Sequence, residues 1–562
     1  MTAVSWRMRR PVPAGGAPWA GLEREWGLSA SAARLAWMRA DAPGELAWRL
    51  DPSWARTTDP FLLEGMGAAV ARIRQALAAA EPICVYGDYD VDGVTATALL
   101  VRVLEKLGAR VAFFIPNRFN DGYGLHLDCI RELAAASGPA LMVSVDCGVR
   151  SGAEVEASRA LGLDWVITDH HALGEQLPAA AAVLHPALGD YGNPHLAGVG
   201  VAFKLAQALL GATPTPRAED QPFLDGLLKL VALGTVADMV PLCGENALLV
   251  KRGLTALAGA NGPGLAALLK AARVDGAVRA QHIGFGMGPR INAVGRMGGA
   301  EDAVRLLLTR DPAEAGRLMA RVEALNLERR EIQRALAERL PPPGAAPFDL
   351  VVEPEAHKGV IGIVAGQRMR ASGRPAGVGT LEDGVVHCSL RAPAGYDLRP
   401  ALELVRPYIL AGGGHQYAAG LSFAHGRLGF IRKTLERVAQ EQVAPGAGVP
   451  ALLVDGCGTE LAPSLADLER LEPFGQAFAE PLLAVAGRLA GPVRSFGAGH
   501  RKFRLQGEPH EFTWFASVHE RNDGSEPEAL ADELCLAVAP LDSRQWGRSW
   551  RVETRLLSAE EA

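Results

Sequence analysis

Three aspartates at alternate positions are the part of the sequence best suited to chemistry. Asp88, Asp90 and Asp92 lie in the stretch GDYDVDG, directly after the apolar run ICVY and before a helical pattern that begins near Val94. In extended backbone alternate side chains point to one side, so the three carboxylates are expected to share a face. Carboxylates that close repel one another unless a cation lies between them, and a divalent metal ion is the simplest such cation. An isolated DxDxD pattern, however, is more often a solvated acidic turn.

Further acidic residues and two histidines follow the next apolar runs. Asp146 ends the run in SVDCG, and ITDHH supplies Asp169, His170 and His171. Consecutive strands of a doubly wound sheet bring their carboxyl ends to one edge, where ligands bind. A lone histidine is more often structural, but two adjacent histidines at a third acidic strand end favour a metal site. Asp169 could instead orient its neighbours, and Asp238 in LGTVADMVPL adds a carboxylate after an apolar helix.

The mixture of carboxylates and imidazole suits two Mn²⁺ or Mg²⁺ ions better than zinc, because no thiolate is placed among them. Two such ions, roughly 3.5–4 Å apart, can activate a water molecule and neutralise the oxygens of a phosphate ester. No GxGxxG motif follows the first strand and no P-loop is present, which argues against a dehydrogenase and a P-loop nucleotidase. The residues therefore predict a metal-dependent phosphoesterase.

The elements that would position these residues follow a βαβ pattern. From Ile83 onward, short apolar runs alternate with helical stretches, which predicts an α/β fold with a parallel sheet covered on both faces. Proline-rich breaks at 341–347 and 444–450 mark domain boundaries. We predict an N-terminal extension (1–75) without assigned chemistry, a phosphoesterase domain (76–311), a connecting helix (312–340), a smaller α/β domain (341–445) and an OB-like β-barrel (446–562).

Composition limits the class of protein. The chain of 562 residues is long enough for several domains, and its formal charge of −6 argues against indiscriminate coating of nucleic acid without excluding a basic groove. The seven cysteines form no CxxC pair, so neither a zinc site nor a disulfide framework is expected. No apolar run is long enough for a membrane span, and the N-terminus lacks the pattern of a secretory signal. We expect a cytoplasmic protein without membrane contact.

In order along the chain, GDYDVDG, VDCG, TDHH and the helix-end Asp238 resemble the motifs of the DHH phosphoesterase superfamily. Longer stretches look like those of its RecJ family of single-strand exonucleases, namely residues 116–125, 196–210, 229–242, 283–297, 357–365 and 412–420. The resemblance runs from about residue 60 to the OB-like end. It implies a DHH domain, a long helix, a DHHA1 domain and an OB-like nucleic-acid-binding domain.

The resemblance also implies roles for individual residues. The matches to the ligands of two metal ions are Asp88, Asp90, Asp92, Asp146, His170 and Asp238, with Asp146 as the bridge. His171 matches a catalytic histidine that meets the scissile phosphate. His415, in GGGHQYAAG with Gly413 and Gly414, matches the DHHA1 histidine that closes over the substrate. Glycines allow a phosphate to approach the backbone closely, although glycine-rich turns are usually only turns.

A directional exonuclease must also recognise the end of a strand. The candidates for a pocket that binds a terminal 5′-phosphate are Arg118, Arg290, Asn292, Arg296, Ser389 and Arg391. Some of these arginines are expected to be surface salt bridges instead. Phe119 and Tyr123 could stack on bases or belong to a loop core. In the OB-like domain, Phe503 is expected to face the core, and at most one of Trp514 and Phe515 can face a strand.

The sequence thus favours a 5′→3′ exonuclease that hydrolyses single-stranded DNA to mononucleotides in DNA repair and recombination. It would act as a monomer, beside a helicase and a single-strand-binding protein. One alternative is a DHH-family phosphodiesterase for short oligonucleotides or cyclic dinucleotides, which would have no use for an OB-like domain. Another is a non-catalytic scaffold, which would have no reason to keep mutually repelling carboxylates.

Overall fold

The computed structural model of the chain describes most of its length. The described residues are 5–11, 17–40, 43–117, 124–138, 140–259, 261–442, 451–458, 465–497, 500–508, 510–515, 534–541 and 549–555. Three of the candidate substrate-binding residues, Arg118, Phe119 and Tyr123, lie outside this set.

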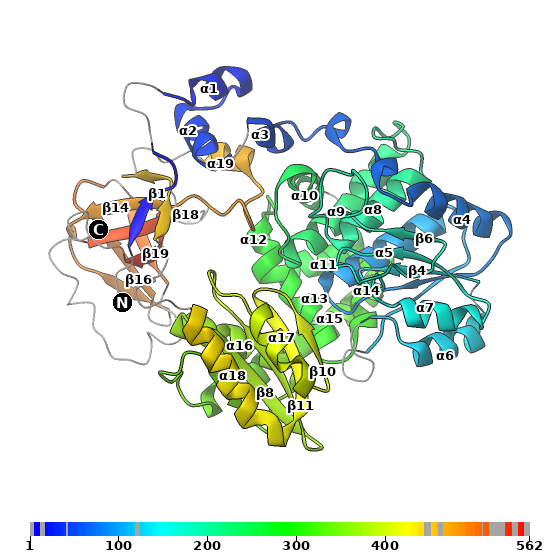
Figure 1. The fold of residues 1–562 in the computed structure, drawn as a ribbon. Coiled ribbons are helices and arrows are strands. Elements are labelled where there is room, and N and C mark those ends of the chain that lie inside the picture. The colour runs from blue at the N-terminus through cyan, green and yellow to red at the C-terminus, as the bar shows by residue number, and fades with distance from the viewer. Residues whose placement is uncertain are drawn as a thin grey trace.

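A five-stranded parallel sheet forms the centre of the largest part of the molecule (Figure 1). Its strands are β2 (Ile83–Tyr86), β3 (Val111–Phe114), β4 (Leu141–Val145), β5 (Asp164–Thr168) and β6 (Ala182–Leu184). Their order is β3-β2-β4-β5-β6, and every neighbouring pair is parallel, as predicted. From β2 the chain runs to β3 on one side, and from β3 it crosses over to β4 on the other side of β2. The topological switch point therefore lies between β2 and β4. This is where an open parallel sheet binds its ligands.

The pleat of these strands divides their side chains between two hydrophobic cores. On β2, Ile83 and Val85 belong to the larger core, whereas Cys84 and Tyr86 pack on the opposite face with Trp165. The larger core is covered by α4 (Met66–Ala78), α5 (Val91–Lys106) and α8 (Gly198–Leu209), with α9 (Gln221–Ala237) packed on α5 and α8. The other face carries α6 (Leu127–Ser137) and α7 (Gly152–Arg159). Burial on both faces explains the uninterrupted apolar runs of the strands.

Further helices extend this body and lead out of it. They are α10 (Gly244–Leu257), α11 (Pro263–Ala271), α12 (Ala280–His282), the π-helix η3 (Ile283–Met287), α13 (Gly288–Arg296) and α14 (Ala300–Leu308). The predicted long helix is α15 (Pro312–Arg339), whose first turn is capped by Asp311 through the amides of Ala313 and Glu314. Among the helices that the structure describes, none is long and apolar enough to cross a membrane.

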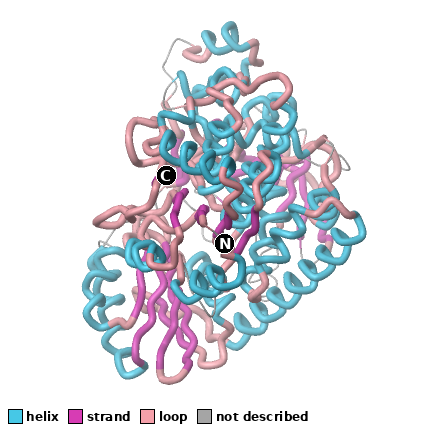
Figure 2. Tube along the Cα trace, turned by 90° about the vertical axis from the view of Figure 1, so that its right-hand side faces the viewer, coloured by secondary structure: helices cyan, strands magenta, loops and turns pink. Residues whose placement is uncertain are grey.

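A second α/β unit follows α15. Its strands are β7 (Asp349–Val352), β8 (Ala376–Glu382), β9 (Val385–Arg391), β10 (Ala411–Gly414) and β11 (Ala418–Ala424), in the order β10-β11-β9-β8-β7. Helix α16 (Lys358–Ser372) packs on one face, and α17 (Arg399–Val405) and α18 (Leu428–Gln442) pack on the other. Figure 2 shows this sheet side-on in its lower part, between helices. Strand β10 lies at the edge of the sheet, where its backbone is exposed.

The C-terminal strands form the predicted OB-like barrel. They are β13 (Gly456–Cys457), β14 (Leu483–Gly487), β15 (Arg494–Phe496), β16 (His500–Arg504), β17 (Glu511–Trp514), β18 (Leu534–Leu541) and β19 (Ser549–Arg555). The order β14-β18-β19-β17-β16 closes on itself, because the amide of Ala490 donates to the carbonyl of Arg504 at 2.8 Å. Phe503 and Phe512 are buried in its core, as the alternation along the strand predicted for Phe503.

The N-terminal residues fasten the barrel to the rest of the molecule (Figure 1). Strand β1 (Trp6–Met8) pairs in parallel with β12 (Leu452–Val454), and α2 (Ala30–Arg39) and α3 (Pro43–Leu50) pack against α19 (Leu465–Leu471). Helix α1 (Ala20–Trp26) packs on α2. The buried carboxylate of Asp455 accepts from Arg9 at 2.9 Å and from Arg39 at 2.6 Å. Buried Arg49 of α3 donates to the carbonyl of Leu242, just before α10, and to that of Pro473, just after α19. It thus links the first domain to the segment that leads into the barrel.

Removal of the Asp455 carboxylate should loosen this N-terminal attachment. Asp455→Ala leaves the buried Arg39 guanidinium without its anion, which should cost about 3–5 kcal/mol of unfolding free energy. Urea denaturation followed by tryptophan fluorescence would measure the loss. The matched control is Asp51→Ala, because the Asp51–Arg56 pair is exposed and should be worth about 1 kcal/mol or less. Equal losses for the two variants would contradict the role of Asp455.

Candidate metal centre

The loop between β2 and α5 places the first three aspartates. Asp90 is the N-cap of α5, and its carboxylate accepts from the amides of Asp92 at 2.9 Å and Gly93 at 3.2 Å. The helix therefore begins at Val91, and the prediction of a start near Val94 was wrong because an aspartate N-cap favours helix from the next residue. Asp92 consequently lies in the first helical turn rather than on an extended strand.

The Asp92 carboxylate is held by a second helix. Its oxygens accept from the amides of Gly198 at 2.6 Å and Val199 at 2.9 Å, at the N-terminus of α8. The positive end of the helix dipole stabilises a carboxylate in this position. A Cβ atom on Gly198 would lie 2.6 Å from Asp146 Oδ1, so the approach of α8 requires glycine there. Sequence analysis missed this contact, although the glycine in LAGVG was its signal.

Asp146 follows β4 in the left-handed region, with φ of 61°. Aspartate tolerates this conformation better than most residues, and the amide donates to the Thr168 carbonyl at 2.9 Å. Such backbone is uncommon and gathers at functional sites. The turn brings Asp146 Oδ1 to 3.0 Å from His170 Nε2.

His170 stands among the carboxylates. Its Nε2 lies 3.7 Å from Asp92 Oδ2 and 3.7 Å from Asp238 Oδ2, at the end of α9. Three overlapping groups each keep their ligand atoms within 4.8 Å of one another: Asp88, Asp90 and Asp146; Asp92, His170 and Asp238; Asp146, His170 and His171. His170 Nε2 is buried and makes no hydrogen bond within the part of the chain that the structure describes. Oxygen and imidazole atoms at this spacing fit divalent cations.

The electrostatics of the cluster favour a cation as well. Burial and the neighbouring Asp90 raise the pKa of Asp92 to about 7, and burial and Asp92 raise that of Asp238 to about 9. Burial and the same neighbours raise the pKa of Asp146. Burial lowers the pKa of His170 to about 3, so its Nε2 lone pair is available to a metal. Without positive charge between them, these carboxylates destabilise one another.

Asp169 orients His171. Its Oδ1 accepts from His171 Nδ1 at 2.8 Å, and its Oδ2 accepts from the Val149 amide at 2.9 Å. Burial alone would raise the pKa of Asp169, but the interaction with His171 outweighs it and lowers this pKa to about 2. For His171 the signs are reversed: burial alone would lower its pKa, but the interaction with Asp169 outweighs burial and raises this pKa to about 9. His171 therefore carries a proton at neutral pH, and its ring can donate to an anion.

A pocket of about 410 Å³ opens beside His171. Its lining includes Arg150 and Ser151 after β4, and Gly412 of β10, so it spans two domains. Sequence analysis missed Arg150 and Ser151, which come two and three residues after the acidic motif VDCG.

The strand β10 also carries the predicted glycines, and the predicted histidine follows it. His415 is exposed and comes three residues after Gly412, which lines this pocket. Partial burial and the positive charge of His171 lower the pKa of His415. A Cβ on Gly413 would meet open space, which leaves its backbone accessible. A Cβ on Gly414 would lie 2.4 Å from Ala419 Cβ, so that glycine serves the packing of the hairpin.

Three of the predicted end-binding residues gather at the first turns of α16. Arg296 Nη1 donates to the Gly359 carbonyl at 3.1 Å. The side chains of Ser389 and Arg391 lie against Gly362 of the same helix. A Cβ added to that glycine would be 2.9 Å from Arg391 Nη2 and 3.3 Å from Ser389 Oγ. Two guanidinium groups and a hydroxyl beside a helix N-terminus form suitable surroundings for a phosphate.

The structure does not bring Arg290 and Asn292, the other described candidates for the 5′-phosphate pocket, to the group at α16. Arg290 is an internal link: it pairs with Glu323 and donates to the carbonyls of Gly286 and Ala271, each at 2.8 Å. Asn292 Oδ1 accepts from the amide of Val91 at 3.3 Å and so ties α13 to the start of α5.

An alanine at position 198 should disturb the metal centre without unfolding the protein. In Gly198→Ala the new methyl group would displace the Asp146 carboxylate, and Mn²⁺ affinity should fall at least about tenfold, or ~1.4 kcal/mol. Calorimetric titration with Mn²⁺ would measure it. Gly200→Ala on the same helix is the control, because its Cβ would meet only the flexible Leu196 side chain, at 3.2 Å. Unchanged Mn²⁺ affinity in Gly198→Ala would contradict the proposed packing constraint.

Comparison with known proteins places this geometry in a family. Residues 82–235 match the model for the DHH family, N-terminal domain, and residues 347–441 match that for the DHHA1 domain. The single-stranded-DNA-specific exonuclease RecJ of Dickeya dadantii is 38% identical over 491 residues, which cover 82% of this chain and 84% of that protein. RecJ of Escherichia coli is 37% identical, over 80% of this chain and 82% of its own length. RecJ of Bacillus subtilis is 37% identical over 80% of this chain, which spans 58% of that protein.

A solved structure agrees over nearly the whole chain. The crystal structure of RecJ in complex with Mn²⁺ from Thermus thermophilus superposes with a TM-score of 0.82 at 31% identity, covering 98% of this chain and 78% of that one. The family resemblance and the fold class predicted from sequence are thereby confirmed. The chain belongs to the RecJ family within the DHH phosphoesterases.

Proposed function

We propose that the protein is a metal-dependent 5′→3′ exonuclease that hydrolyses single-stranded DNA to mononucleotides, in DNA repair and recombination. One observation carries the proposal: His170 Nε2 lies within 3.7 Å of the carboxylates of Asp92, Asp146 and Asp238, at the switch point of a parallel sheet. Relatives of this family are named as single-stranded-DNA-specific exonucleases, and solved RecJ structures contain Mn²⁺ or Mg²⁺.

The ligand groups suit two divalent ions, Mn²⁺ or Mg²⁺. Asp88, Asp90 and Asp146 would hold one ion, and Asp92, His170 and Asp238 the other, with Asp146 close to both groups. Two ions bound there would lower the pKa of a water molecule and neutralise charge on the phosphate oxygens. The α8 amides favour the ionised form of Asp92 and fix its direction before any ion binds.

Two histidines contact the substrate phosphate in this proposal. His171 holds a proton, because Asp169 raises its pKa to about 9, and it donates to a phosphate oxygen. His415 is exposed directly after β10 of the DHHA1 domain, and Gly412 of that strand lines the pocket beside His171. Since the two residues belong to different domains, the substrate phosphate would lie between them.

The strand end is recognised by Arg296, Ser389 and Arg391. Their grouping at the first turns of α16 supports this assignment, because guanidinium groups offer paired donors to phosphate oxygens. Arg290 is left out, since its guanidinium is engaged by Glu323 and two carbonyls.

Exposed aromatic side chains suggest where the rest of the strand would run. On the barrel, the rings of Phe496 and Phe515 lie 5.4 and 5.3 Å from the ring of His500, and Lys502 lies above Phe496 at 5.5 Å. Phe496 is 38% and Phe515 43% exposed, so both can stack on bases. Trp514 instead packs against the barrel core.

A second exposed apolar site lies near the metal centre. Phe285, in the π-helix η3, is 88% exposed, and Met239, next to Asp238, is 70% exposed. A Cβ on Gly288 would lie 3.4 Å from Ala237 Cβ, which sets this π-helix beside the end of α9. Both side chains are therefore further candidates for contact with bases near the cleavage site.

The alternative substrate class is short oligonucleotides or cyclic dinucleotides. The barrel and its exposed aromatic rings favour a long strand, because a small ligand would have no use for them. We also propose that the protein works as a monomer in the cytoplasm with a helicase and a single-strand-binding protein. Its seven free cysteines suit a reducing compartment.

Single strands blocked by phosphorothioates at one end test the direction of cleavage. In Mn²⁺, the wild type should degrade strands with a blocked 3′ end and stop at once on strands with a blocked 5′ end. Asp146→Ala should remove cleavage of both, because it deletes a carboxylate shared by two ligand groups. Degradation despite a 5′ block, with arrest by a 3′ block, would contradict the direction. Cleavage of dinucleotides alone would favour the alternative substrate class.

Loss of Arg391 should separate recognition of the strand end from cleavage. Arg391→Ala should weaken binding of 5′-phosphorylated strands roughly tenfold or more, with a smaller effect on 5′-hydroxyl strands. Fluorescence anisotropy with both strands would measure this in Ca²⁺. Arg406→Ala is the control, because Arg406 is exposed in the same domain and pairs with Glu403. An equal loss for the two kinds of strand end would exclude Arg391 from the end pocket.

A further inference from the structure

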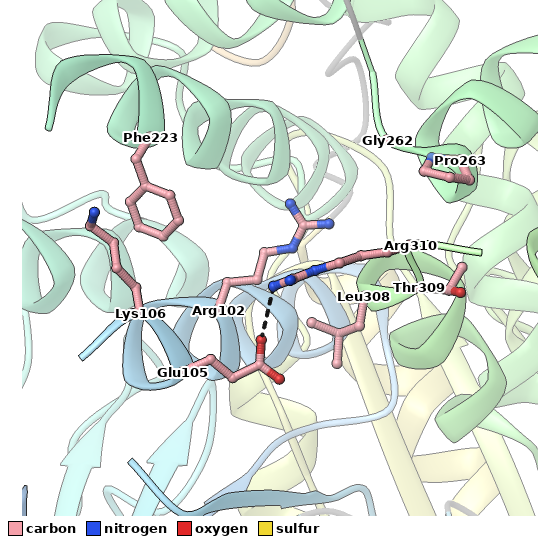
Figure 3. Close-up of a pocket in the computed structure, with 9 residues that line it drawn as sticks. All are labelled: Arg102, Glu105, Lys106, Phe223, Gly262, Pro263, Leu308, Thr309 and Arg310. Carbon is pink, nitrogen blue, oxygen red and sulfur yellow. Dashed lines mark ion pairs between the residues drawn. The ribbon is translucent and has the colours of Figure 1, made fainter. Parts of the chain in front are cut away.

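A second cluster of like charges lies at the opposite end of α5 from the metal centre. Figure 3 shows a pocket into which Arg102 of α5 and Arg310, just after α14, extend side by side. Lys106, on the last turn of α5, stands at one side of it. Arg102 and Lys106 come 10 and 14 residues after Asp92 on this helix, so they lie roughly 15 and 21 Å from it along the helix axis.

Positive charge in this pocket exceeds negative charge. Arg310 pairs loosely with Glu105 at 3.6 Å, and Lys106 with Asp220 at 3.6 Å. Asp220 also accepts from Arg217 at 2.6 Å, so Lys106 shares its partner. Burial lowers the pKa of Arg102, and the neighbouring Arg310 lowers it further. Arg102 and Arg310 are therefore close enough to repel each other.

A neighbouring lysine adds to the cation cluster. Burial lowers the pKa of Lys229 on α9, and the charge of Arg102 lowers it again. Around the pocket, positive side chains thus outnumber the carboxylates Glu105 and Asp220 among the residues that the structure describes. An anion between the guanidinium groups would relieve this repulsion, as a metal ion does for the aspartates at the other end of α5.

The shape of the pocket suits a small organic anion. Its volume is about 340 Å³, within the usual range for ligand sites. On one side stands the ring of Phe223, with Lys106 Nζ 5.0 Å from its centre. On the other side are Gly262 and Pro263, at the start of α11, a helix without a side-chain cap. The positive end of α11 thus adds to the arginines.

We propose that this pocket binds a nucleoside monophosphate, with its phosphate between Arg102, Lys106 and Arg310 and its base toward Phe223. Arg102 is anchored by its bond to the Leu307 carbonyl at 2.5 Å, whereas the Arg310 side chain is 90% exposed and can close over the ligand. Guanidinium groups match phosphate oxygens in pairs, and an aromatic ring accepts any base. The site is separate from the metal centre and does not depend on the proposed nuclease activity.

Chemical protection of Lys106 tests the proposal. Its side chain is 38% exposed and can be acetylated, so the rate of acetylation can be followed by mass spectrometry on the full chain in Mn²⁺. Titration with dAMP should slow acetylation of Lys106 severalfold and to saturation, and leave the exposed Lys270 unchanged. Inorganic phosphate should protect only at higher concentration, and deoxyadenosine should not protect.

Two matched variants make the test specific. Arg310→Gln should raise the dAMP concentration for half-protection at least about tenfold. Arg305→Gln, which removes an exposed arginine of α14 paired with Glu301, should leave that concentration unchanged. The same half-protection in Arg310→Gln, equal protection of Lys270, or equal protection by deoxyadenosine would overturn the proposal. Equal affinity for inorganic phosphate and dAMP would overturn the nucleotide assignment. Since the readout involves no cleavage, none of these outcomes bears on the nuclease proposal.

Discussion

The mutual repulsion of buried carboxylates is the constraint on which the rest of the structure depends. Asp92 and Asp146 are almost completely buried at the switch point of the sheet, with Asp88, Asp90 and Asp238 around them. A cluster of this kind is unfavourable in a protein interior unless cations occupy it. The surrounding backbone is shaped to hold it: Asp90 caps α5, the α8 amides bind Asp92, and Asp146 adopts a left-handed conformation. A Cβ at position 198 would lie 2.6 Å from an Asp146 oxygen, and one at position 234 would lie 2.7 Å from an Asp92 oxygen. Both positions therefore require glycine.

A metal centre of this kind acts on a long substrate only if other parts of the molecule hold the strand across it. The DHHA1 domain brings Gly412 to the pocket beside His171, and groups Arg391 with Arg296 at α16. The long helix α15 joins this domain to the first, and α13, anchored to the metal loop through Asn292, contacts both α15 and α16. On the other side, the N-terminal residues fix the barrel through Asp455 and Arg49. Polar contacts between distant segments therefore fix how the domains are attached to one another.

Much of the first domain could be predicted from sequence, because its information is local. Apolar runs indicated the strands, and acidic residues at their ends indicated the ligand groups, which topology alone brings together. Contacts between distant segments could not be predicted. The glycine of LAGVG is consistent with a close backbone approach, but it does not reveal that the amides of Gly198 and Val199 bind Asp92, and nothing near Arg290 reveals Glu323. The N-terminal residues had no visible chemistry, since their role is to pair β1 with β12 and to supply arginines to Asp455. The start of α5 was misjudged because Asp90 was considered as a ligand and not also as a cap.

The central claim is that the aspartates and His170 form one site for two cations. Anomalous diffraction at the manganese edge, from crystals grown with Mn²⁺, tests it most directly. The account predicts two peaks, about 3.5–4 Å apart, with Asp146 between them and His170 Nε2 bound to one. No peak at this edge of the sheet, or a single fully occupied peak that Asp146 does not touch, would contradict it.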